Sequence, residues 1–178
     1  MIQLWTFRSI NIYIFILVCI MTAVPSTSFS KELETRHIFK IERSKNANIV
    51  QYDVQLTPDG KIYSKEAVIA YWIRLAKDGK RKELSSTQTR WAYGFKTKYN
   101  ATDNVATLKM TADIGRKIKV YAVDGVYHGE TRIDGQPAFI EKIYITTVEG
   151  GMIPKVKSIG LYGKDTSTGE DRHEKIKP

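Results

Sequence analysis

The sequence has only one cysteine among its 178 residues, Cys19, and it lies within the first thirty. Those thirty residues are typical of a secretory signal peptide. One cation, Arg8, precedes an apolar run over residues 10–24, and small residues stand at Ser28 and Ser30. We therefore expect cleavage after Ser30, so that residues 1–30 are removed. The mature chain would then have no thiol, which excludes a disulfide, a cysteine nucleophile and a thiolate metal site.

Two other interpretations of this leader stay open. Acylation of Cys19 would make a lipoprotein, although the bulky Val18 stands where a small residue is expected. An uncleaved leader would anchor the protein in a membrane, although the apolar run is shorter than the about 20 residues that a spanning helix needs. We expect removal, and hence an exported protein, periplasmic or extracellular, without a stable membrane span.

The sequence also has no motif that specifies a reaction. It contains no Gly-x-Ser-x-Gly nucleophile elbow and no Gly-rich phosphate loop. The three histidines, His37, His128 and His173, are far apart in the sequence and form no His-x-x-x-His pair, so neither a metal site nor a cofactor is predicted. No catalytic residue can be assigned, and an enzyme is the less favoured interpretation.

Acidic residues are fewer than basic ones, 19 against 28, which gives a formal net charge of +9. Such an excess is compatible with anionic partners such as lipid headgroups, anionic polysaccharides or nucleic acid. The alternative weighs more: the excess charge only keeps a secreted protein in solution. A nucleic-acid partner is not predicted, because the lysines are scattered singly and no RNA- or DNA-binding motif is present. Hydrophobic residues make up 42% and charged residues 26%, as in ordinary globular proteins, and residues 31–178 are within the size of one domain.

Alternating apolar residues are the main structural signal. The alternation is clearest at Val50, Tyr52, Val54 and Leu56, which share one face of a predicted strand. The other predicted strands are 38–43, 67–75, 95–99, 105–112, 117–123, 137–148 and 155–162, and one short helix is predicted at 83–93, with Gly94 as its C-terminal cap. Short strands with Gly-marked turns predict a mainly β fold, a single antiparallel β-barrel or sandwich of about eight strands with one short helix.

Several short motifs resemble a known family. They are Ile-Glu-Arg-Ser-Lys-Asn-Ala-Asn-Ile-Val at 41–50, Tyr52-Asp53, Tyr71-Trp72-Ile73, Ala92-Tyr93-Gly94, Gly163-Lys164-Asp165 and Thr168-Gly169. Together they resemble the bacterial domain-of-unknown-function 4833 family over essentially all of the mature chain. The resemblance implies an exported single-domain protein in which residues 164–176 belong to the domain. It implies no catalytic residues, because the family has no assigned activity.

The first candidate binding group is the polar corner formed by Arg43, Lys45, Asn46 and Asn48. Arginine offers a planar fork to a carboxylate or phosphate, and asparagine offers both a donor and an acceptor. The alternative is structural and weighs more, because asparagines in tight turns usually satisfy the backbone.

The second group is Trp72, Arg90 and Tyr93, since aromatic rings with one cation suit a ligand that has an apolar body and an anionic end. Core packing is again the alternative. We therefore favour a binding module for a small amphipathic or anionic envelope ligand. A small envelope hydrolase is a second hypothesis and requires two of Asp124, His128, Glu130 and Asp134 to converge in a cleft. A structural or assembly protein is a third and requires an exposed apolar patch. The oligomeric state is not predicted.

Overall fold

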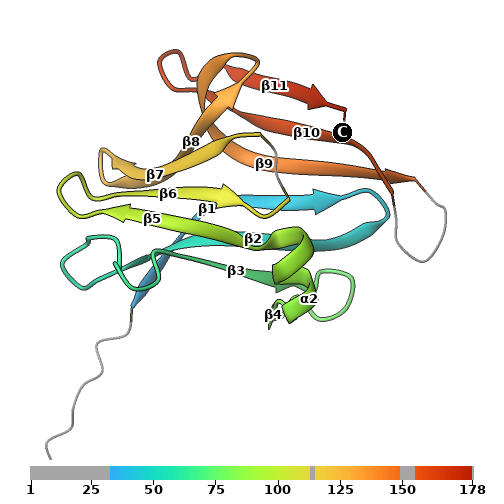
Figure 1. Cartoon of the computed structure of the whole chain (residues 1–178), viewed down its shortest axis with the longest axis horizontal. Coiled ribbons are helices and arrows are strands. Elements are labelled where there is room, and N and C mark those ends of the chain that lie inside the picture. Colours follow the sequence, from blue (N-terminus) through green and yellow to red (C-terminus); the bar gives the residue numbers. More distant parts are fainter. Residues whose placement is uncertain (1–32, 113–114, 149–154, 178) are drawn as a thin grey trace, which may run out of the picture. The chain divides into compact units, whose positions relative to one another are not determined.

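The computed structural model describes residues 33–112, 115–148 and 155–177, so the expected signal peptide lies outside the described residues. A long strand, β9 (Gln136–Val148), is the centre of the architecture (Figure 1). It pairs along its length with β10 (Lys155–Asp165), and its other edge is shared by β8 (Val126–Ile133) and β1 (Glu34–Arg43). The sheet therefore branches at β9.

The main path of the sheet runs in the order β4-β3-β2-β1-β9-β8-β7-β6-β5, and β11 continues from β10. The remaining strands are β2 (Asn46–Leu56), β3 (Val68–Ile73), β4 (Arg81–Glu83), β5 (Phe95–Asn100), β6 (Val105–Met110), β7 (Lys117–Val123) and β11 (Asp171–Ile176). The β1–β9 pair is parallel, whereas the other pairs are antiparallel.

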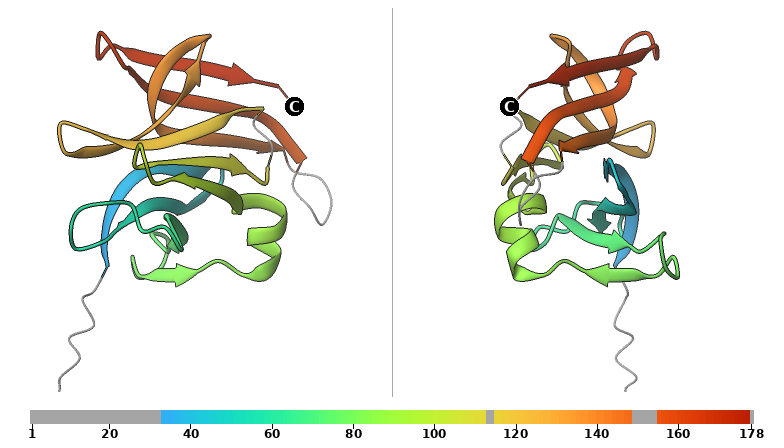
Figure 2. Two further views of the ribbon diagram at one scale, coloured as in Figure 1. Left: turned by 60° about the vertical axis from the view of Figure 1, so that its left-hand side comes forward. Right: turned by 90° about the vertical axis from the view of Figure 1, so that its right-hand side faces the viewer.

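The prediction of a mainly β fold with one short helix is confirmed, but the prediction of a single antiparallel barrel or sandwich of about eight strands is wrong. The strands form one curled, mixed sheet of eleven strands, which leaves β4 and β5 at the ends of its main path. Figure 2 shows how the curl brings β5 and β6 opposite β1 and β2. The mixed topology arises because β1 lies between its hairpin partner β2 and the distant β9, a long-range pairing that local patterns do not encode.

Three strands were not predicted: β4, β8 and β11. Residues 124–136 have the composition of a Gly-rich connection in which Asp124-Gly125 and Asp134-Gly135 are expected to be hairpin turns. Both turns are confirmed, and all four residues have positive φ. Between these turns β8 alternates regularly, with Tyr127, Gly129, Thr131 and Ile133 buried. β11 is an edge strand with a polar sequence, and its presence agrees with what the family resemblance implied for the terminal segment.

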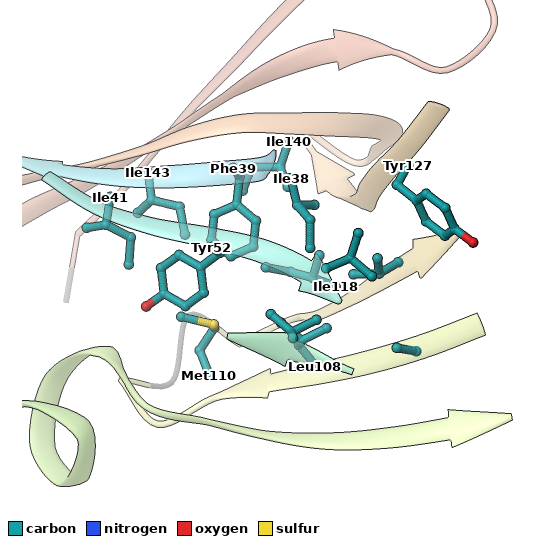
Figure 3. Close-up of a cluster of buried hydrophobic side chains, with 14 of the residues drawn as sticks. Ile38, Phe39, Ile41, Tyr52, Leu108, Met110, Ile118, Tyr127, Ile140 and Ile143 are labelled. Atoms are coloured by element: carbon teal, nitrogen blue, oxygen red, sulfur yellow. The ribbon is translucent and has the colours of Figure 1, made fainter. Parts of the chain in front are cut away.

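The core lies between the facing parts of the curled sheet. Side chains from β1, β2 and β9 point toward side chains from β6 and β7 (Figure 3). Phe39 and Tyr52 stack at its centre with ring centroids 4.4 Å apart. The predicted apolar face of β2 is confirmed, because Val50, Tyr52, Val54 and Leu56 are all buried.

The helical segment is shorter than predicted and changes type along its length. It consists of α2 (Ser86–Gln88) and the π-helical turn η1 (Thr89–Tyr93). Ser85 and Gln88 form a capping box at its start, each side chain bonding the other's backbone. Gly94 does end the segment, but in an extended conformation; glycine is needed because a Cβ there would lie 1.9 Å from the Thr89 carbonyl oxygen. Within the described ranges, no helix is long and apolar enough to cross a bilayer.

Candidate ligand pocket at the β1–β2 corner

A pocket of about 430 Å³ opens beside the turn that joins β1 to β2, and we call it the Arg43 pocket. Its volume is within the range of sites that hold small ligands. The lining residues are Arg43, Asn46, Asn48, Trp72, Arg74, Lys82, Glu83, Ser85 and Gln88. The pocket therefore brings together members of both candidate groups, which the sequence presented as separate: three residues of the polar corner and Trp72 of the aromatic group.

The corner itself is a two-residue turn at Ser44 and Lys45, with Lys45 at a φ of 66°. Asn46 Oδ1 accepts a hydrogen bond from the Asn48 backbone N at 2.9 Å, and Asn48 Oδ1 accepts one from the Ala76 backbone N at 3.1 Å. Both amide oxygens thus accept hydrogen bonds from backbone N–H groups, as expected if the asparagines stabilise the turn. What the two asparagines can still offer a ligand is their NH₂ groups, which are donors.

Arg43 is the last residue of β1 and lies against two aromatic rings. Its Cζ is 5.3 Å from the ring centroid of Trp72 and 5.6 Å from that of Tyr93. The two rings meet edge to face with their centroids 5.3 Å apart. These distances are within the range of cation–π attraction, which fixes the guanidinium at the pocket wall. Burial raises the pKa of Tyr93, and the Arg43 charge only partly offsets that effect, so the phenol stays neutral.

The wall of the pocket is positively charged. Within the described part of the chain, Arg43 forms no ion pair and its Nε, although buried, has no hydrogen-bond partner. Arg74 Nη2 pairs with Asp78 outside the lining, and Glu83 pairs with Arg81 at 3.3 Å. Three cations and one anion line the pocket in total, which favours an anionic occupant.

The sequence missed five of the lining residues, which are Arg74, Lys82, Glu83, Ser85 and Gln88. Arg74 could have been noticed in the sequence, because it is a charged residue that directly follows the apolar strand β3. Lys82 and Glu83 reach the pocket because β4 pairs with β3, which places Lys82 opposite Trp72. Ser85 and Gln88 belong to the capping box of the helical segment that follows β4.

Three predicted residues are not among those that line the pocket. Tyr93 lies beneath Arg43, and the Arg90 guanidinium lies 5.5 Å from the ring centroid of the exposed Trp91. Lys45 occupies the turn.

A buried polar cluster lies on the other face of β2. Asp53 is 3% exposed and accepts hydrogen bonds from His37 Nδ1 at 3.2 Å, Gln51 Nε2 at 3.0 Å and the Tyr71 hydroxyl. Burial alone would raise the pKa of Asp53, but these three bonds outweigh it and lower the pKa. The buried Asp53 carboxylate has hydrogen-bond donors for both of its oxygens, so the cluster is a structural network that joins β1, β2 and β3.

The hydrolase hypothesis requires two of four residues in one cleft. His128 and Glu130 lie on the same face of β8, but of these two only Glu130 is among the lining residues of a hollow on that side. Asp124 and Asp134 occupy turns at opposite ends of β8, roughly 25 Å apart for a strand of this length. The ring of His128 stacks on that of Phe139 with the centroids 4.3 Å apart. Glu130 Oε2 accepts a hydrogen bond from the Tyr121 hydroxyl at 2.5 Å. No group of three or more His, Cys, Asp or Glu side chains that could hold a metal ion gathers anywhere in the described ranges.

The comparison with known families can now be added to this geometry. The family described as Domain of unknown function (DUF4833) matches residues 39–175. The chain belongs to this family. The match includes β2 to β10, all of β11 except Ile176, and every lining residue of the Arg43 pocket together with Tyr93. No curated protein and no solved structure matches the chain.

Proposed function

We propose that this domain is an exported binding module that holds a small amphipathic anion of the cell envelope in the Arg43 pocket. One observation carries the proposal: Arg43 lines the pocket without a carboxylate partner in the described chain, while two aromatic rings hold its guanidinium in place. A partly buried charge without a partner costs free energy. A carboxylate or phosphate would supply the missing partner through paired hydrogen bonds.

The other lining residues support the same ligand chemistry. Lys82 adds a second cation, and the NH₂ groups of Asn46 and Asn48 add donors that suit anionic oxygens. The indole of Trp72 supplies apolar surface for the body of the ligand. An anionic head beside an apolar body therefore matches the pocket better than a purely polar or a purely apolar molecule.

Tryptophan fluorescence tests this proposal directly. In a Trp91→Phe background, Trp72 is the tryptophan that remains within the described residues, so its emission reports on the pocket. Octanoate is the anionic probe, and octanol is its uncharged counterpart. We expect saturable binding of octanoate and at least tenfold weaker binding of octanol, since about 1.4 kcal/mol of ionic hydrogen bonding corresponds to a factor of ten.

Substitution of Arg43 completes the test. Arg43→Met keeps the aliphatic stem and removes the charge, and it should weaken octanoate binding about tenfold or more. Arg36→Met is the matched control, because Arg36 is an exposed residue of the same strand, roughly 23 Å away along β1. Unchanged octanoate binding by the Arg43→Met protein, or equal binding of octanoate and octanol, would overturn the proposal.

A further inference from the structure

A second charged surface lies on strands that do not contribute to the Arg43 pocket. We call it the lysine face, and it consists of five exposed residues, Lys96, Lys98, Lys109, Lys117 and Lys119. In register, Lys96 lies opposite Lys109, which in turn lies opposite Lys117. Lys98 and Lys119 lie on either side of Thr107 in the next row. Residues in register on neighbouring strands share a face of the sheet, so the five side chains emerge on one side.

The alternation of apolar and polar residues in β6 and β7 shows which side of the sheet the lysine face is on. Ala106, Leu108 and Met110 alternate with the outward residues of β6, and Ile118 and Val120 alternate with those of β7. All five of these apolar residues are buried in the core. The lysines consequently project from the opposite, solvent side of the same strands.

The arrangement is unfavourable for the isolated protein. Neighbouring strands are about 4.8 Å apart, and like charges directly opposite each other destabilise a sheet. None of the five lysines forms an ion pair with another described residue. Lysine on an edge strand such as β5 discourages edge-to-edge association, but Lys109, Lys117 and Lys119 are on β6 and β7, which are paired on both sides. Protection of the sheet edge therefore does not account for the array.

A hollow of about 510 Å³ lies on the same surface. Its lining residues are Lys98, Tyr99, Asn100, Asp103, Val105, Thr107, Lys119, Tyr121 and Glu130. Glu130 is the register partner of Lys119, yet its carboxylate accepts a hydrogen bond from the Tyr121 hydroxyl at 2.5 Å and forms no ion pair with Lys119. The hollow thus combines two cations with two carboxylates, hydroxyl groups and two aromatic rings, which suits a hydroxyl-rich sugar ring.

We infer that the lysine face binds an extended anionic polysaccharide that crosses β5, β6 and β7, with its negative groups on the two lysine rows and one sugar ring in the hollow. A flat bilayer would bridge such a hollow without filling it. Leu75 and Trp91, the exposed side chains of the types that interfacial binding uses most, lie outside these three strands, and Val123 at the end of β7 is the one exposed large hydrophobic residue on them. Single-stranded nucleic acid usually needs several aromatic platforms. Tyr121 is at an outward position of these strands, whereas Tyr99, which also lines the hollow, packs against the core.

Binding of labelled polygalacturonate and dextran sulfate, measured by fluorescence anisotropy over a range of salt concentrations, tests this inference. Uncharged dextran, double-stranded DNA and vesicles of phosphatidylglycerol with phosphatidylcholine are the comparison probes. The test variant is K96Q/K109Q/K117Q, which removes one complete row. The matched control is K155Q/K157Q/K175Q, which removes the same charge from exposed positions of β10 and β11. Circular dichroism verifies that both variants are folded.

The protein should bind both anionic polysaccharides and not dextran. The test variant should lose at least tenfold in affinity at low salt, and the slope of log affinity against log salt should become shallower by about two to three. The control variant and Arg43→Met should retain the original affinity, which separates this surface from the Arg43 pocket. Equal losses in the test and control variants, no binding to either polysaccharide, or tighter binding to the vesicles or DNA would each overturn the inference.

Discussion

The ion pair between Arg116 and Glu174 should hold the C-terminal strand to the rest of the sheet. Arg116 Nη1 donates to Glu174 Oε2 at 2.6 Å, and Nη2 pairs with Oε1 in a bidentate arrangement. The same guanidinium donates to the Arg132 carbonyl oxygen at 2.6 Å, and Glu174 Oε2 also accepts from the Asp134 backbone N at 2.5 Å. The carboxylate of Glu174 on β11 therefore binds both Arg116, the residue before β7, and Asp134 in the turn between β8 and β9.

The expected contribution of Glu174 follows from this geometry. The hydrogen bonds from Arg116 lower the pKa of Glu174 from 4.5 to about 2, which corresponds to at most about 3 kcal/mol of stability. The two side chains are 25% and 21% exposed, so water screens part of this interaction. We therefore expect Glu174→Gln to lower the free energy of unfolding by about 1–2 kcal/mol at pH 7, or the melting temperature by about 3–8 °C.

The pH dependence gives this prediction its sharpest test. Because the pKa of Glu174 is lower in the folded protein, its stabilisation is complete above the unfolded value of 4.5 and is lost as the pH falls toward about 2. Thermal unfolding of both proteins between pH 7 and about pH 2.5 should show the difference shrinking over that window. A double-mutant cycle with Arg116→Met isolates the pair. A variant as stable as the wild type at pH 7, or a difference that stays constant down to pH 2.5, would refute the reasoning.

Two further predictions concern buried hydroxyl and carboxyl groups and are measured by urea unfolding. Tyr52→Phe removes the hydroxyl that donates to the Tyr93 carbonyl oxygen at 2.7 Å, so it should cost about 1–2 kcal/mol; an unchanged midpoint would contradict this. Asp53→Asn should cost about 2–3 kcal/mol at pH 7, because three donors lose a charged acceptor. The pKa of Asp53 is lowered, so this cost should diminish as the pH falls below the unfolded value of 3.8, and a pH-independent cost would count against the role of its charge.

Local pattern predicted much of the secondary structure. The alternation in β2 located its buried face correctly, and the Ser44-to-Asn48 segment was recognised as a corner. The two hairpin turns around β8 were predicted, but the strand between them was not, because Gly129 within it favoured a loop. Gly129 is needed there because a Cβ would lie 2.9 Å from a methyl carbon of Ile38, a contact with a distant strand that the local sequence does not reveal.

The candidate site was predicted in pieces. The sequence pointed to Arg43 and Asn48 as one group and to Trp72 and Tyr93 as another, and the structure adds that Arg43 lies against both rings. Neither group gave a reason to expect Lys82 in the same pocket, because that residue arrives through a three-residue strand, β4. Short polar strands leave almost no periodic signal.

The sequence by itself therefore determined the mainly β class, the position of the corner and the family, because these depend on alternation, turn residues and local motifs. The tertiary structure decided the parallel pairing of β1 with β9, the open curl of the sheet and the convergence of Arg43 with its aromatic neighbours. It also decided that five singly scattered lysines form one face. The physical reason is that strand register is set by contacts between residues far apart in the chain, and no short window of sequence contains both partners.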